Sequence, residues 1–199
     1  MSRAARALWT VATPARTWLS LIALTLLISG ENLLPFPPGV VYMRRVTGGM
    51  TFLDFGFEPA TQAHALLVAF GPAGRQTQAL LTCTVDMLIP LATAIFGALA
   101  ITSLGRRIFG APGRWLGAAG LPVLAALCDY AENATISLLL VTFPHDPVWL
   151  SRVTHFLTIA KVATYSLTLA LVLLAAAWTL GAMLAGTRAS KIGAGRARF

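Results

Sequence analysis

Four long apolar runs limit what this chain can fold into more than any other feature of its sequence. A helix crosses the hydrocarbon core of a bilayer, which is about 30 Å thick, with about 20 apolar residues. The runs do not show the alternation in segments of about ten residues that marks membrane β-strands. We therefore predict an all-α fold, an integral membrane four-helix bundle, as one membrane domain over residues 1–199. The predicted spans are residues 17–34, 78–104, 115–142 and 153–185.

The composition of the chain also favours a membrane protein. Hydrophobic residues make up 57% of the sequence and charged residues 11%, whereas soluble domains are about 25% charged. The net charge of +8 does not indicate a nucleic-acid partner, because the basic residues form short clusters between apolar runs rather than one patch. The partner that we expect is the lipid bilayer, and no nucleic acid.

The distribution of Lys and Arg predicts the orientation of the spans. These residues gather in the N-terminal segment, in the connection between the second and third spans, and in the tail at 186–199. In a four-span chain the three segments share one side, which the positive-inside rule places in the cytoplasm. We expect a multi-pass protein of the inner (plasma) membrane with both termini cytoplasmic. The first run exceeds a signal-peptide core of about 7–15 residues, so we expect it to be a retained helix.

The long connection at residues 35–77 is predicted to lie on the outer side and to contain one short helix. Its first residues, PFPPG, end the first span. Glu58 and Pro59 suit the first turn of the short helix. Gly71 and Pro72 are expected to end it.

Ionisable and amide side chains interrupt the apolar runs at similar depths. A charge at the centre of a spanning helix costs about 2.5–3.5 kcal/mol on insertion scales, so we expect these groups to meet inside the bundle. Asp129 and Glu132 are three residues apart, share one helix face, and would then both point inward. All the ionisable members except Asp129 fall in the outer half of the bilayer. The predicted substrate- or ion-binding residues are Glu31, Asp86, Asp129, Glu132, Asn133, His155 and Lys161.

The charges of this predicted site do not balance, because four carboxyl groups meet a single lysine, Lys161. Either some of the carboxyl groups stay protonated or a cation supplies the missing charge. A purely structural reading is also open, in which a bridge between Lys161 and a carboxylate, together with Asn133, holds the helices to each other. His155 is either a member of the site or a histidine at the membrane surface.

Two prolines lie close to the predicted site in the sequence. Pro90 follows Asp86 by four residues, so we expect it to kink the second span and to leave the Asp86 carbonyl without its helical partner. Pro122 precedes Asp129 by seven residues and is expected to act in the same way. Each kink would either open the site or only bend its helix.

Four motifs link the segment from Leu53 to Lys161 to known sequences. Together they resemble a family of small bacterial four-span membrane proteins. The resemblance covers about half of the chain and implies a four-span fold; it supports the choice of positions and implies no activity. The motifs are Gly71…Gly74-Arg75, Asp86…Pro90, Pro122…Asp129-x-x-Glu132-Asn133, and Lys161.

Three hypotheses for the function remain open from the sequence. The first is proton- or cation-linked handling of a small solute; four spans are few for a pathway, so this hypothesis implies a homodimer or larger assembly. The second is a membrane-embedded enzyme in which Asp86, Asp129, Glu132 and His155 hold a divalent metal. The third is a non-catalytic subunit of a larger membrane complex. The sequence identifies no cofactor, and it leaves open whether the protein is an enzyme.

Overall fold

The computed structural model describes the backbone of residues 3–51, 62–145 and 147–196, with side chains up to residue 185. Every regular element in these residues is helical, which confirms the predicted all-α class. The elements are α1 (Arg3–Val11), α2 (Pro14–Leu33), α3 (Val40–Thr47), α4 (Ala63–Cys83), α5 (Val85–Phe109), the 3-10 helix η2 (Arg114–Gly120), α6 (Leu121–Thr142) and α7 (Val148–Arg196).

Three of the described stretches are long and apolar enough to cross a membrane: Ala63–Phe109, Arg114–Thr142 and Val148–Ala185. A fourth is obtained if α1 and α2, which are bent by 88° relative to each other, count as one span. These lengths exceed the roughly 20 residues that a bilayer requires. The chain is therefore an integral membrane protein, while its arrangement as a bundle of four spans stays a prediction.

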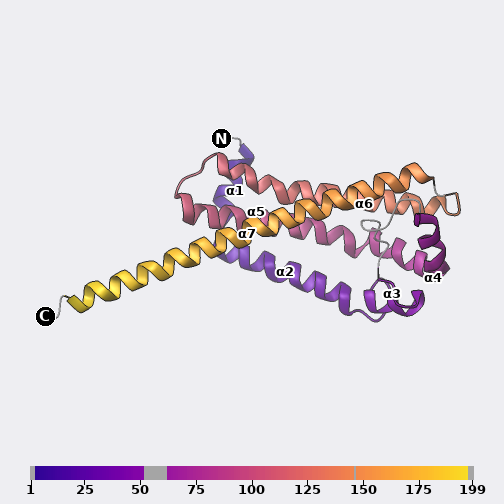
Figure 1. Ribbon diagram of the computed structural model, residues 1–199, viewed down its shortest axis with the longest axis horizontal. Helices are drawn as coiled ribbons and strands as arrows, with labels where there is room; N and C mark the ends of the chain where they lie inside the picture. The colour runs from indigo at the N-terminus through magenta and orange to yellow at the C-terminus, as the bar shows by residue number, and fades with distance from the viewer. Residues whose placement is uncertain (1–2, 52–61, 146, 197–199) are drawn as a thin grey trace.

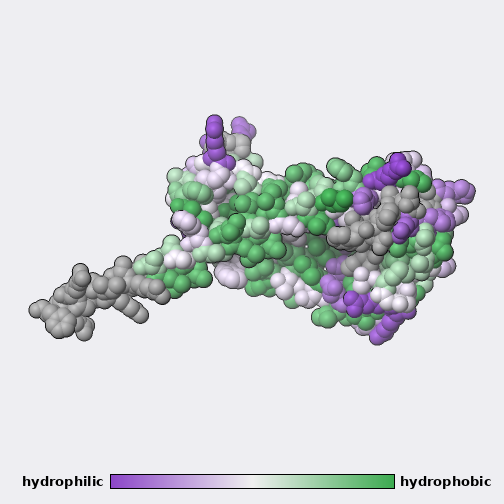
Figure 2. All heavy atoms as spheres, in the orientation of Figure 1, coloured by the Kyte–Doolittle hydropathy of each residue, from purple (hydrophilic) through white to green (hydrophobic). Residues whose placement is uncertain are grey.

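Helix α5 occupies the middle of the molecule and packs against α2, α6 and α7. The long helices run along the same axis, with α1 and the end of α7 at one end and α3 and α4 at the other (Figure 1). On the face shown in Figure 2, hydrophobic residues cover the middle of the length and hydrophilic residues gather toward the two ends. This distribution fits a molecule whose middle faces hydrocarbon.

Two glycines allow α5 to approach its neighbours closely. A Cβ atom at Gly97 would lie 2.6 Å from the Cβ of Pro122, and one at Gly105 would lie 2.3 Å from Cζ3 of Trp115. Both distances are shorter than any normal contact, so a larger residue would force the helices apart. Pro122 lies in the first turn of α6, where proline is accommodated without a bend. The predicted kink at this position was therefore wrong.

The connection at residues 35–77 contains more helix than the sequence predicted. Helix α3 was not expected, and α4 does not end at Gly71. Instead Gly71 adopts φ 65° and ψ 173°, and the helix resumes with Pro72. The kink leaves carbonyl groups without a backbone N–H donor from the helix. The guanidinium of Arg75 donates a hydrogen bond of 2.6 Å to one of them, the Leu67 carbonyl. The predicted helix that overlapped residues 58–61 falls partly outside the described residues.

The first part of α4 packs against α3 and α6. Leu67 and Phe70 are buried against Ile136 and Leu139 of α6, with Met43 of α3 in the same cluster. The packing of these side chains joins the connection at residues 35–77 to α6.

The other end of the bundle is closed by α1, which the sequence did not predict. The guanidinium of Arg106 lies 4.4 Å from the centre of the Trp9 ring, and Trp9 meets Trp115 edge to face at 5.9 Å. Helix α7 also departs from expectation, because it continues to Arg196 rather than ending at 185. It projects beyond the rest of the bundle (Figure 1).

Candidate functional site

The polar face of α6 lies at its interface with α7, the most extensive helix pair of the described residues. Asp129, Glu132 and Asn133 are all buried, and so is Ile136 on the same face. Residues three and four apart on a helix lie on one side, so the spacing of these residues accounts for their common orientation. The structure thus brings the three polar side chains of α6 inside the molecule.

Lys161 of α7 lies against both carboxyl groups of this face. Its ammonium forms an ion pair with Glu132 and lies 3.7 Å from Oδ1 of Asp129. Glu132 is only 2% exposed as a side chain, whereas Lys161 keeps 25%. A contact between Lys161 and a carboxylate of another helix, expected from the sequence, is present. One ammonium therefore serves two carboxyl groups.

Two hydroxyl groups of α7 donate hydrogen bonds to these carboxyl groups. Thr158 donates a hydrogen bond to Oε1 of Glu132, and the Tyr165 hydroxyl donates one of 2.9 Å to Oδ2 of Asp129. Each carboxylate can accept several hydrogen bonds, so hydroxyl and ammonium donors act on it together. We name the set Asp129, Glu132, Thr158, Lys161 and Tyr165 the carboxylate–lysine site.

Neither Thr158 nor Tyr165 was among the site residues predicted from the sequence. A signal for both was present: polar residues recur at alternating intervals of three and four along α7, the spacing of one helix face. Four members of this stripe are buried outright, namely Ser151, Thr154, Thr158 and Thr168. Lys161 and Tyr165 lie on the same stripe.

Asp86 belongs to the N-terminal turn of α5 rather than to the interior of a continuous helix. The helix breaks at Thr84, with φ −125° and ψ −93°, which lies inside the predicted second span. Pro90 lacks an N–H and so leaves the Asp86 carbonyl free. The Nδ2 of Asn133 donates a hydrogen bond of 3.4 Å to that carbonyl, which links α5 to α6.

A second bond between α5 and α6 follows the same pattern. The Tyr130 hydroxyl donates a hydrogen bond of 2.8 Å to the carbonyl of Met87. Asn133 and Tyr130 thus both hold the first turns of α5, and with them the Asp86 carboxyl, beside the polar face of α6. The Asp86 carboxyl is within the electrostatic range of Asp129, Glu132 and Lys161.

Glu31 comes to the same region from α2. Its side chain is buried, at 8% exposure, and it is within electrostatic range of Asp86 and Asp129. Because α2 ends at Leu33, Glu31 occupies the last helical turn, where the helix dipole disfavours a negative charge. Its position is therefore unfavourable for helix stability alone.

His155 is half-buried on α7. A helix turns about 100° per residue, so His155 lies about 100° around α7 from Thr154 of the polar stripe.

In the described part of the chain, no group of three or more His, Cys, Asp or Glu side chains is placed to hold a metal ion. The hypothesis of a metal-dependent enzyme gains no support from these residues.

A cavity of about 310 Å³ adjoins the carboxylate–lysine site. Asp129 and Tyr165 lie at one side of it, and Thr93 and Thr168 are further polar residues in its wall. The rest of the wall is apolar and comes from α2, α5 and α7. This volume lies at the lower end of the range for ligand cavities, about 300–1,000 Å³. The apolar lining residues are Leu24, Ile28, Ile89, Phe96, Gly97, Leu169 and Val172.

Comparison with known proteins gives no assignment for the chain. No protein-family model, no curated protein and no solved structure matches it. The resemblance noted from the sequence therefore assigns no family, and the function has to be argued from the site itself.

Proposed function

We propose that the protein handles a small solute inside the membrane in a manner linked to protons or to a cation. The carboxylate–lysine site, with Asp86, Glu31 and Asn133 beside it, is the place where the solute or the ion binds. The cavity against Asp129 is the space that the solute occupies.

One observation carries this proposal: Lys161 serves both Asp129 and Glu132 in the interior of a membrane protein. The desolvation cost of burying an ion pair is offset only when each charge has a partner of opposite sign. Here two further carboxyl groups, Asp86 and Glu31, act electrostatically on the same region. The excess of carboxyl groups is neutralised by bound protons or by a cation, and either event can be coupled to the binding of a solute.

A purely structural role accounts for less of this arrangement. One carboxylate would be sufficient to pair with Lys161 and hold α6 to α7. The position of Glu31 at the C-terminal end of α2 reduces the stability of that helix, and a second carboxyl on α6 adds repulsion. Costs of this kind are characteristic of functional sites in membranes.

We expect the working form to be a homodimer or a larger assembly, since four spans are few for a pathway. In the most apolar stretch of α7, only 6% of the residues are buried within the chain. This leaves most of that stretch to contact lipid or a second copy. Purification with a stoichiometric partner of different sequence would instead favour the role of a subunit in a larger complex.

The proposal is tested by measuring the thermal unfolding temperature of the purified protein across pH and ions. The buffers cover about pH 5 to 8, where perturbed carboxyl groups titrate, with Na⁺, K⁺, Mg²⁺ or Ca²⁺ chloride against choline chloride at matched ionic strength. We expect lower pH or one metal cation to raise the unfolding temperature, because a ligand that binds the folded state stabilises it.

Asp86→Asn and Glu31→Gln should each reduce that shift. The matched control is His145→Gln, which removes an exposed titratable group outside the site and should leave the shift unchanged. The proposal is overturned if neither pH nor any cation changes the unfolding temperature of the unaltered protein, or if the change is the same in all variants.

A further inference from the structure

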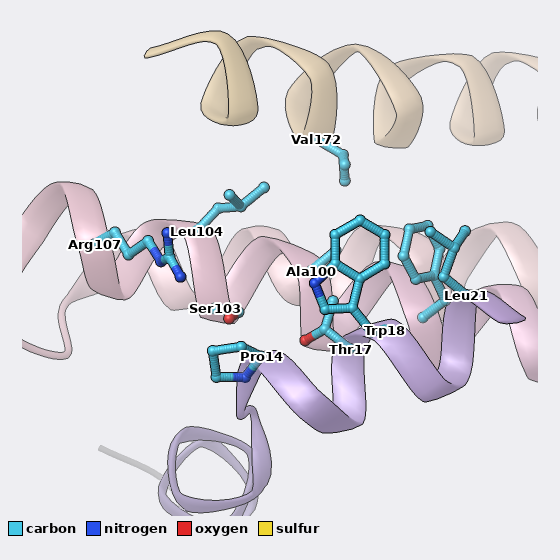
Figure 3. Close-up of a pocket in the computed structure, with 10 residues that line it drawn as sticks. Pro14, Thr17, Trp18, Leu21, Ala100, Ser103, Leu104, Arg107 and Val172 are labelled. Carbon is cyan, nitrogen blue, oxygen red and sulfur yellow. The ribbon is translucent and has the colours of Figure 1, made fainter. Parts of the chain in front are cut away.

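The cavity at Asp129 lies next to a second cavity of about 240 Å³. The two share Phe96 and Val172 as wall residues. The second cavity is bounded by Trp18 of α2, Ala100 of α5 and Val172 of α7 (Figure 3). We call the two cavities together the α2–α7 groove.

The two ends of the groove differ in their chemistry. At one end lies Asp129, which is 6% exposed and keeps acceptor capacity beyond its contacts with Lys161 and Tyr165. At the other end lies Arg107, whose side chain is exposed. The walls between them are mainly apolar. The groove therefore has the form of a slot for a hydrocarbon chain with a buried acidic group at one end.

We propose that the α2–α7 groove binds an amphiphile with a cationic amine headgroup, either protonated or quaternary, and a hydrocarbon tail. The headgroup lies at Asp129, and the tail lies along Phe96 and Val172 toward Arg107. This inference rests on the proposed function, because it names the class of solute that the carboxylate–lysine site handles. The ligand enters from the bilayer, between α2 and α7.

Charge decides between a cationic and an anionic headgroup. Asp129 and its neighbours on α5 and α2 carry more carboxyl groups than the single Lys161 can balance, so an amine reduces the imbalance. Of the residues that line the groove, Arg107 carries the one positive charge, and its side chain is exposed. Electrostatic attraction is much weaker in water than in a buried site, so the buried end of the groove dominates selectivity.

The test uses the full-length protein in nanodiscs of zwitterionic lipid, so that the lipid itself carries no net charge. The probe is dodecyltrimethylammonium with a photoreactive diazirine in its chain, and its control is dodecyl sulfate with the same diazirine. Crosslinks are located and quantified by mass spectrometry. We expect the cationic probe to label residues of the groove at least about tenfold more than the anionic probe, which corresponds to a charge–charge attraction to Asp129 of at least about 1.4 kcal/mol.

Three variants make the test specific. Asp129→Asn removes the charge at the headgroup end and should lower labelling by the cationic probe about tenfold. Val172→Phe fills the junction of the two cavities and should also lower it. Leu173→Phe is the control: it introduces the same side chain one residue further along α7, at a position where the side chain is 59% exposed, and should leave labelling unchanged. If Asp129→Asn does not fold, the pair of phenylalanine variants still decides.

Equal labelling by both probes, or equal effects of Val172→Phe and Leu173→Phe, overturns the inference. Preferential labelling near Arg107 by the anionic probe also overturns it and identifies a site for an anionic lipid. If labelling fails while the unfolding temperature still depends on pH or a cation through Asp86 and Glu31, only the groove is ruled out. If that dependence is absent but cationic labelling needs Asp129, the proton or cation linkage fails and the amine site stands.

Discussion

Tyr165 donates its hydroxyl hydrogen to Oδ2 of Asp129 at 2.9 Å, while Lys161, one turn earlier on α7, lies 3.7 Å from Oδ1. The two oxygens of one buried carboxyl group are thus held by two residues of a single neighbouring helix. This arrangement sets the direction of Asp129, which is also the carboxyl group that borders the apolar cavity.

Tyr165→Phe should therefore destabilise the protein by about 1–3 kcal/mol, because Oδ2 of a buried carboxyl group loses a donor. The measurement is the free energy of unfolding in detergent. Tyr42→Phe is the matched control, since no hydrogen bond of the Tyr42 hydroxyl is present among the described residues. Equal costs for the two substitutions would show that the bond to Asp129 contributes nothing.

The contribution of Asn133 to the free energy of unfolding should depend on Pro90. Asn133→Ala removes the donor to the Asp86 carbonyl and should cost about 1 kcal/mol. In a Pro90→Ala background the restored N–H can satisfy that carbonyl within α5, so Asn133→Ala should then cost less. A double-mutant cycle of unfolding free energies measures the difference. A cost that is the same in both backgrounds would contradict the proposed link.

The orientation of the chain can be tested with introduced cysteines. The background is Cys83→Ala/Cys128→Ala, which removes both native thiols. The positive-inside rule predicts that Arg45→Cys is labelled by a membrane-impermeant maleimide added to intact cells. It also predicts that Arg6→Cys is labelled only after permeabilisation. Both positions are exposed. The reverse pattern of labelling would invert the topology.

Loss of the ammonium should make stability more dependent on pH. In Lys161→Ala the buried carboxyl groups lose their cation, so the folded state favours their protonated form. The folded state then binds more protons than the unfolded state, and the free energy of unfolding decreases as pH rises. We expect Lys161→Ala to approach the stability of the unaltered protein at about pH 5 and to diverge from it toward about pH 8. A constant difference across that range would show that no buried carboxyl group takes up a proton.

The long helices and the polar face of α6 could be predicted because their signals are local. Apolar runs of sufficient length and the spacing of Asp129, Glu132 and Asn133 can be read without knowing what packs against them. The break at Thr84 and the bend between α1 and α2 could not, because they depend on contacts between distant segments. The hydrogen bond from Asn133 to the first turn of α5 and the packing of Arg106 over Trp9 are examples.

The contacts between side chains of the site were harder to predict than the residues that form it. That Lys161 would meet a carboxylate of another helix follows from charge alone, but which carboxylate depends on the rotation of α6 against α7. The hydroxyl stripe of α7 illustrates the same limit, since Thr and Tyr are common in apolar helices. Their role becomes evident only when Glu132 and Asp129 lie opposite Thr158 and Tyr165.

The most direct test of the account is a double-mutant cycle on Lys161 and Glu132, measured as unfolding free energy in detergent at pH 7. Lys161→Ala should cost about 3–5 kcal/mol, because it leaves the buried carboxyl groups of Glu132 and Asp129 without their cation, and Lys161→Ala/Glu132→Gln should recover the part of that loss that comes from Glu132. Val162→Ala, one residue along α7 and 43% exposed, is the control and should cost far less. If Lys161→Ala is as stable as the unaltered protein, or if the double variant is no more stable than Lys161→Ala, Lys161 is not paired with buried carboxyl groups and the proposed site does not exist.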